Sequence, residues 1–167
     1  FLRAVRGNEP QEALYKEYWA RFDELFWRVE VKQGRLLRPR SDLFLQHFLS
    51  SRLAVDVPIT HLFEEYRFWI ERDKPFATVK DELSCLARQG EDFRRIIVPT
   101  RDDVLFGLAT FIDAFDVRTT YPLVLAMLDQ GYNDSQWKLV SRILESYLLR
   151  RAICGLTTKN YNRIFLT

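Results

Sequence analysis

Apolar residues recur at helical spacing along most of the chain, and no strong strand-type alternation interrupts them. The clearest segment is Gln11 to Arg28, whose apolar positions fall at i, i+3, i+4 and i+7. The residues of this stripe are Tyr15, Tyr18, Trp19, Phe22, Leu25, Phe26 and Val29. Because that spacing lines one face at 3.6 residues per turn, we predict a helix over residues 11–28.

Turn and capping residues divide the rest of the chain into further helices. Gly34 and Pro39 break the pattern, so residues 31–40 are predicted to form a loop, or at most a short hairpin. Thr78 with Asp81, and Thr100 with Asp103, have the spacing of capping boxes. The predicted helices are 42–53 with Ser41 as N-cap, one from Thr60, 78–97, 101–115, 121–130, and one from 133–135 to Cys154, with a last element from Lys159.

This pattern predicts an all-α fold, an irregular bundle of about seven or eight helices with short loops. Apolar residues make up 47% and aromatic residues 14% of the 167 residues, so the chain is able to bury a core. Six glycines and six prolines are few for an all-β protein. We expect a single helical domain over residues 1–167. Since the chain begins without Met and ends on an apolar run, we expect it to be a fragment of a larger protein.

Charge and cysteine usage indicate a soluble cytoplasmic protein. The net charge is +2 with 29% charged residues, a smaller imbalance than a dedicated nucleic-acid coat shows. No apolar run reaches the ~18 residues that cross a bilayer, so no membrane partner is expected. Cys85 and Cys154 lie far apart in apolar helical segments, and we predict inert buried thiols.

The sequence offers no complete catalytic, metal or cofactor site. Phosphate-cradling loops need closely spaced glycines, and the nearest two here are Gly90 and Gly107. His47 and His61 have no second histidine at ligand spacing, so we predict a core or half-buried His47 and a surface His61. Adjacent carboxylates point about 100° apart on a helix and do not converge on one substrate. We therefore expect no catalytic residue, no metal and no cofactor in this chain.

Two basic clusters are candidates for contact with DNA phosphates. The first lies in the segment around Gly34 and Pro39, and the second lies near the end of the chain. Their members are Lys32, Arg35, Arg38 and Arg40, and Arg150, Arg151, Lys159 and Arg163. Loop cations beside a helix start are able to grip phosphates. The alternative is a solvated loop and cations that complement a helix C-terminus.

Arg151 lies in line with an apolar stripe of its predicted helix. That stripe contains Val140, Leu144, Tyr147 and Leu148. A charge in such a position needs a partner. The partner is either a buried carboxylate, a bound anion or a partner domain.

The most distinctive segment runs from Glu145 to Phe165, with Ser146-Tyr147-Leu148-Leu149-Arg150-Arg151-Ala152-Ile153-Cys154-Gly155 followed by Asn160-Tyr161-Asn162-Arg163-Ile164-Phe165. It resembles the SYLxRRAxCG…NxNxxF stretch of the GmrSD-type restriction family. Earlier segments fit the same pattern: Tyr18-Trp19 before Phe22, Asp42 to Leu49, and Leu62 to Arg67. The likeness spans most of the chain, and the final segment is its most specific part.

The resemblance implies a helical middle region between a ParB-like nucleotide-using domain and an HNH nuclease domain. The chain lacks the family's Asp-Gly-Gln-Gln-Arg signature and its nuclease motif, so no catalytic residue of the family is transferred to it. The implied function is that of a non-catalytic module of a nucleotide-dependent, modification-dependent DNA restriction protein. Its partners would be the flanking domains and double-stranded DNA.

The alternative function is a protein-interaction or oligomerisation scaffold with no DNA contact, in which a second copy of the chain is a partner. The observation behind it is the aromatic content, including Trp19, Trp27, Trp69 and Trp137, since exposed aromatic residues favour interfaces. The competing interpretation of these tryptophans is a bulky core.

Overall fold

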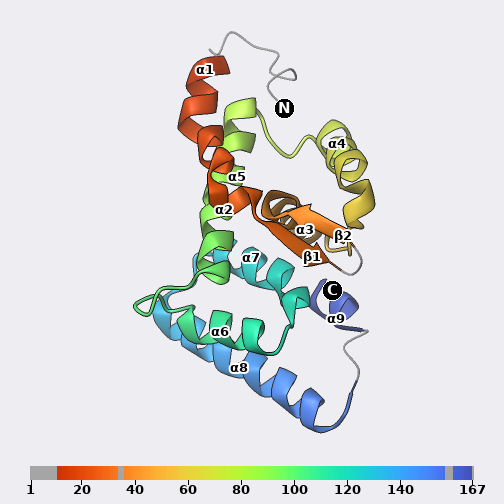
Figure 1. The fold of residues 1–167 in the computed structure, drawn as a ribbon, viewed down its shortest axis with the longest axis vertical. Coiled ribbons are helices and arrows are strands. Elements are labelled where there is room, and N and C mark those ends of the chain that lie inside the picture. Colours follow the sequence, from red (N-terminus) through yellow and green to blue (C-terminus); the bar gives the residue numbers. More distant parts are fainter. Residues whose placement is uncertain (1–10, 34–35, 157–159, 167) are drawn as a thin grey trace. The chain divides into compact units, whose positions relative to one another are not determined.

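The computed structural model describes residues 11–33, 36–156 and 160–166. Helices dominate this part of the chain, and one two-stranded sheet accompanies them, so the all-α prediction is confirmed (Figure 1). The chain divides into two compact units. Unit 1 holds the residues up to Leu49 and Val57–Gly90, and unit 2 holds Ser50–Asp56 and the residues from Glu91 onward. The single domain over residues 1–167 stays a prediction.

Most elements of unit 1 are short. They are α1 (Gln11–Leu14), a π-helical turn (Tyr15–Trp19), a 3-10 turn (Ala20–Asp23), α2 (Leu25–Arg28), β1 (Glu30–Gln33), β2 (Leu36–Pro39), α3 (Arg40–Leu53), a 3-10 turn (Ile59–His61), α4 (Leu62–Asp73) and α5 (Val79–Ile97). The boundaries between the units fall inside α3 and α5. Unit 2 continues with α6 (Phe106–Ala114), a 3-10 turn (Arg118–Thr120), α7 (Tyr121–Asp129), α8 (Asp134–Ile153) and α9 (Tyr161–Leu166).

The prediction of one continuous helix over residues 11–28 is wrong. The segment passes through π and 3-10 turns, and Glu24 is extended with φ −62° and ψ 152° before α2 begins. The extended Glu24 changes the direction of the chain between Phe22 and Trp27. The ring of Phe22 consequently lies with its centroid 4.9 Å from that of Trp27 and 5.8 Å from that of Phe44. Packing of these aromatic rings overrides the local helical periodicity.

Residues 30–33 and 36–39 form a pair of strands, as expected from the hairpin that was the alternative to a loop here. Strands β1 and β2 pair antiparallel, with Lys32 opposite Leu37 and Val31 opposite Arg38. Helix α3 follows directly and begins at Arg40, so Ser41 lies inside its first turn and is not the predicted N-cap. The helix starts early because the Arg40 amide donates a hydrogen bond to the Val29 carbonyl (2.9 Å), which joins the helix start to the base of the hairpin.

The core of unit 1 is built from aromatic rings. Trp27 is 1% exposed and lies among Phe22, Phe26 and Phe44. Gly90 of α5 leaves room for this cluster, because a Cβ there would lie 3.1 Å from the Phe22 ring. Trp27 and Trp69 of unit 1 and Trp137 of unit 2 are buried, which confirms the bulky-core interpretation for these three, whereas Trp19 is half-buried.

Several predicted helix ends are confirmed. Thr78 and Asp81 bond reciprocally at the start of α5, at 3.0 and 3.1 Å. Asn133 caps α8 through a capping box with Gln136. Gly131 and Gly155 take left-handed backbone (φ +68° and +65°) after α7 and α8.

The predicted helix over 101–115 is wrong in its first five residues, which form turns before α6. The capping box expected of Thr100 and Asp103 does not form. The Asp103 carboxylate instead accepts hydrogen bonds from the Leu105 amide and from Arg95 of α5. A tertiary partner has displaced the local one.

Ala54, which follows α3, is an exposed alanine in left-handed backbone with φ +53°. Left-handed backbone costs an L-residue about 1–2 kcal/mol, and glycine avoids this. We expect Ala54→Gly to raise the free energy of unfolding by about 0.5–1 kcal/mol in urea titrations. This is less than the full cost of the left-handed backbone, because glycine also gives the unfolded chain more conformational entropy. The opposite exchange, Gly131→Ala, should lower the free energy of unfolding. An added Cβ at Gly131 would meet no other atom, but the backbone there is left-handed, with φ +68°. Changes of equal sign in both variants would contradict the argument.

Candidate phosphate-contacting residues and the Arg95 cluster

The hairpin does not gather its cations on one surface. Opposite residues of an antiparallel pair share a face and successive residues alternate, so Lys32 and Arg38 project from opposite faces. Lys32 is exposed. Arg38 is half-buried and lies 4.0 Å from the Asp42 carboxylate, whose pKa burial raises more than Arg38 lowers it. Arg35 lies outside the described residues.

Arg40 is a structural cation rather than a loop residue. Its guanidinium donates a hydrogen bond to the Phe26 carbonyl (2.9 Å) and stacks 4.3 Å from the centre of the Phe26 ring. Both contacts tie α3 to the end of α2. The prediction that Arg40 is an exposed loop cation is therefore wrong, because the loop is replaced by a strand that runs directly into α3.

The two described members of the C-terminal cluster differ in their surroundings. Arg150 is exposed in the last turn of α8, whereas Arg151 is half-buried. The Arg151 guanidinium lies 5.7 Å from the centre of the Tyr147 ring and 5.1 Å from that of Tyr161 in α9. Lys159 and the side chain of Arg163 lie outside what the structure describes.

Arg151 thus has aromatic neighbours, as its place in the apolar stripe requires. Tyr161 is 2% exposed, and Phe165 lies within 5.4 Å of Tyr161 and 6.0 Å of Tyr147, measured between ring centres. Stacking of a guanidinium on two tyrosine rings partly offsets the cost of its desolvation. The partners of Arg151 therefore include the aromatic faces of Tyr147 in α8 and Tyr161 in α9.

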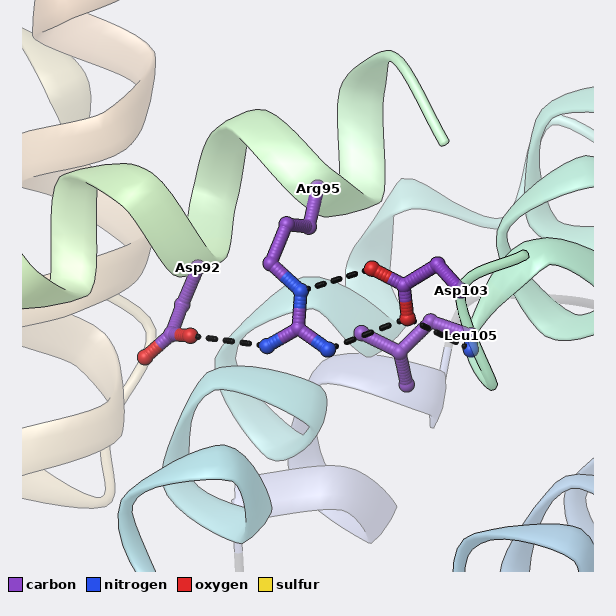
Figure 2. Close-up of polar contacts among 4 residues, drawn as sticks. All are labelled: Asp92, Arg95, Asp103 and Leu105. Atoms are coloured by element: carbon purple, nitrogen blue, oxygen red, sulfur yellow. Dashed lines mark hydrogen bonds and ion pairs between the residues drawn. The ribbon is translucent and has the colours of Figure 1, made fainter. Parts of the chain in front are cut away.

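A cluster that sequence reasoning missed lies between α5 and the turns before α6 (Figure 2). The Arg95 guanidinium binds the Asp103 carboxylate through two nitrogens, Nε at 2.7 Å and Nη2 at 3.0 Å. Its third nitrogen, Nη1, contacts Asp92 one turn earlier on α5 at 3.2 Å. The Leu105 amide donates to Asp103 at 2.9 Å. No sequence pattern indicates this cluster, because Arg95 and Asp103 belong to different elements.

The Arg95 cluster fixes the ionisation of its carboxylate. Hydrogen bonds from Arg95, with a smaller one from the Leu105 amide, hold the pKa of Asp103 below its usual range. The same pairing raises the pKa of Arg95. Every oxygen and nitrogen that the cluster uses is engaged within the fold, so its chemistry is that of a structural clamp.

A second polar contact joins α4 to α5 within unit 1. The Tyr66 hydroxyl donates a hydrogen bond to the Glu82 carboxylate at 2.8 Å. Burial raises the pKa of Glu82 even though this hydrogen bond lowers it. Burial, followed by the charge of Glu82, raises the pKa of Tyr66. The pair therefore holds a carboxylate in a site that disfavours its charge.

This gives Glu82→Gln a predicted pH signature. With a folded pKa above the unfolded one, the folded state binds more protons between the two values, so this group makes stability fall as pH rises through that window. Glutamine stays neutral and its amide oxygen still accepts from Tyr66. We expect the stability of the variant relative to the parent to increase as pH rises from about 4 to 7, measured by urea unfolding. Glu64→Gln, on the exposed face of α4, is the control, and an equal trend there would refute the assignment.

The burial of the two histidines agrees with the prediction, and the burial of the two cysteines does not. His47 is buried and His61 is exposed, as predicted. Both cysteines are free; Cys85 is half-buried and Cys154 is exposed, which corrects the prediction of two buried thiols. Cys154 lies at the C-cap of α8, where the helix has left the core. Within the described residues, no group of three or more His, Cys, Asp or Glu side chains is arranged to hold a metal ion.

Helix α8 has apolar side chains on its outward face as well as its inward one. Its inward face buries Trp137, Leu144 and Leu148. On the opposite side, at about 100° per residue, lies a set that we call the outer stripe: Leu139, Arg142, Ile143, Arg150 and Ile153. Its apolar members are 58–82% exposed. Sequence reasoning missed this stripe because it followed only the inward face, although the spacing of Leu139, Ile143 and Ile153 was a usable signal.

Comparison of the chain with protein-family models, with curated proteins and with solved structures found no match. Among the described helices, none combines the length and apolar character that spanning a bilayer requires.

Proposed function

We propose that the chain is a non-catalytic helical module of a nucleotide-dependent, modification-dependent DNA restriction protein of the GmrSD type. It couples the domains on either side and contributes contacts to DNA phosphates. The observation that supports this is the segment with the most specific resemblance, 145–165. Its residues Tyr147, Arg151, Tyr161 and Phe165 come together in one aromatic and cationic cluster.

The phosphate contacts are assigned to the cations that remain exposed. Among the described members of the two basic clusters these are Lys32 on β1 and Arg150 on α8. Arg40 and Arg151 are engaged with aromatic rings, and Arg38 lies near Asp42, so they contribute less. With so few contacts, binding should be weak, in the micromolar range, and strongly dependent on salt.

Fluorescence anisotropy with labelled duplex DNA, plain and cytosine-modified, tests this function. We expect binding at about 50 mM salt that weakens steeply by about 200 mM. The double variant Lys32→Gln/Arg150→Gln should reduce the slope of log affinity against log salt by about two, because each substitution leaves one phosphate without its cation.

The matched control is Arg72→Gln, which removes an exposed cation of α4 that contacts Asp73. It should leave the slope unchanged. Absence of binding at low salt, or an equal reduction in the control, would reject DNA contact by this chain. Tighter binding of cytosine-modified than of plain DNA would show that this chain recognises the modification.

A second candidate function, an interaction scaffold, is favoured by the outer stripe of α8. A helix with apolar side chains on two opposite faces is normally covered on both, and exposed apolar patches mark interaction surfaces. The tryptophan content no longer supports this function, because three of the four tryptophans are buried. Light scattering of the chain with and without candidate partner segments measures it: a partner-dependent increase in mass is expected.

A further inference from the structure

The outer stripe of α8 combines exposed apolar residues with positive charge. Leu139 is 60%, Ile143 58% and Ile153 82% exposed, at spacings of four and ten residues that keep them within one narrow arc. Arg142 borders this arc and Arg150 lies within it, between Leu139 and Ile143 around the helix; both arginines are exposed. The small side chain of Ser146 lies between the apolar residues.

Neither carboxylate of α8 lies on this arc. The two carboxylates of α8, Asp134 and Glu145, lie at other angles around the helix, toward the side opposite Ile143. The C-terminal end of a helix also favours cations, so Arg150 is stable there without an acidic neighbour. The stripe thus offers exposed aliphatic side chains together with two guanidinium groups, and neither carboxylate of α8 lies among them.

We propose that the outer stripe binds an acidic amphipathic helix of a partner protein. This inference rests on the scaffold function and names the chemistry of the partner. Leucine-type side chains of the partner, at i, i+3, i+4 and i+7, pack on Leu139, Ile143 and Ile153, and its carboxylates pair with Arg142 at the edge of the stripe and with Arg150 near its C-terminal end. Duplex DNA fits less well, because it offers charge to the arginines but no apolar surface to three exposed aliphatic side chains.

The test uses a labelled 18-residue peptide with leucines at that spacing and glutamate at the outward positions. The controls are a peptide with every glutamate replaced by lysine and a scrambled acidic peptide. We expect micromolar binding of the acidic helix to the whole chain in anisotropy titrations, and at least about tenfold weaker binding of both controls.

Three variants locate the site. Ile143→Ser/Ile153→Ser should weaken binding of the acidic peptide at least about tenfold, because both side chains are anchors. Arg142→Gln/Arg150→Gln should weaken it at low salt and less at high salt. Leu25→Ser, at an 80% exposed leucine of α2, should leave it unchanged. Far-UV circular dichroism should be the same for all variants, since every substituted side chain is exposed.

Other results overturn the inference in distinguishable ways. Concentration-dependent mass that Ile143→Ser/Ile153→Ser abolishes, without peptide binding, would show that a second copy covers the stripe, and the scaffold function would stand. DNA binding that Arg142→Gln/Arg150→Gln abolishes and the isoleucine variant keeps, without binding of the acidic peptide, would make the stripe a phosphate surface. If the acidic peptide does not bind and the mass does not change with concentration, both the proposed partner and the scaffold function are refuted.

Discussion

Replacing Trp27 by alanine is expected to lower the free energy of unfolding by about 3–5 kcal/mol. The indole is 1% exposed and lies among three aromatic rings, with centroids 4.8–5.4 Å away. Truncation removes its buried apolar area and leaves a cavity that the rigid neighbours Phe22 and Phe44 fill only in part. Since domains of this kind are stable by about 5–15 kcal/mol, the loss is a large fraction of the total.

Guanidinium or urea unfolding followed by circular dichroism measures this loss. Leu25→Ala is the matched control, because Leu25 lies two residues away in the same short helix and is 80% exposed. It should change the free energy by less than about 0.5 kcal/mol. Should Trp27→Ala fail to fold, Trp27→Phe preserves an aromatic ring and should give a smaller measurable loss. A cost below about 1 kcal/mol for Trp27→Ala would show that the aromatic cluster is not the core of unit 1.

Asp103→Asn is expected to cost about 1–2 kcal/mol at neutral pH. It replaces the acceptor of a two-point hydrogen bond from Arg95 and removes the charge that pairs with it. The carboxylate side is 12% exposed and the guanidinium 41%, so solvent screens part of the interaction and the expected cost stays below that of a fully buried pair.

The pH dependence supplies a second measurement for Asp103. Its pKa is lowered in the folded state, so its contribution is present above the unfolded value of about 3.9 and is lost as pH falls through the folded pKa. The parent should therefore lose stability over this acid range more steeply than Asp103→Asn. Asp102→Asn, an exposed neighbour, should follow the parent. A double-mutant cycle with Arg95→Gln should return a coupling energy, and a value near zero would contradict the clamp.

The sequence by itself determined the elements that local interactions decide. The capping box of Thr78 and Asp81, the Asn133 cap and the glycines after α7 and α8 act within a few residues, so α5, α7 and α8 were predicted close to their observed ends. Apolar periodicity and composition likewise determined the helical fold class and the buried His47. These signals depend on neighbours along the chain and not on the rest of the fold.

Only the tertiary structure decided where long-range partners compete with local ones. Packing of Phe22, Trp27 and Phe44 broke the helix predicted over residues 11–28. Asp103 accepts a hydrogen bond from Arg95 and does not form the predicted capping box with Thr100. Arg40 contacts Phe26 and Arg151 contacts Tyr161, so these two members of the basic clusters are engaged with aromatic residues that the cluster spacing does not indicate. The free energy of such interactions depends on residues far apart in the chain, which periodicity and spacing do not encode.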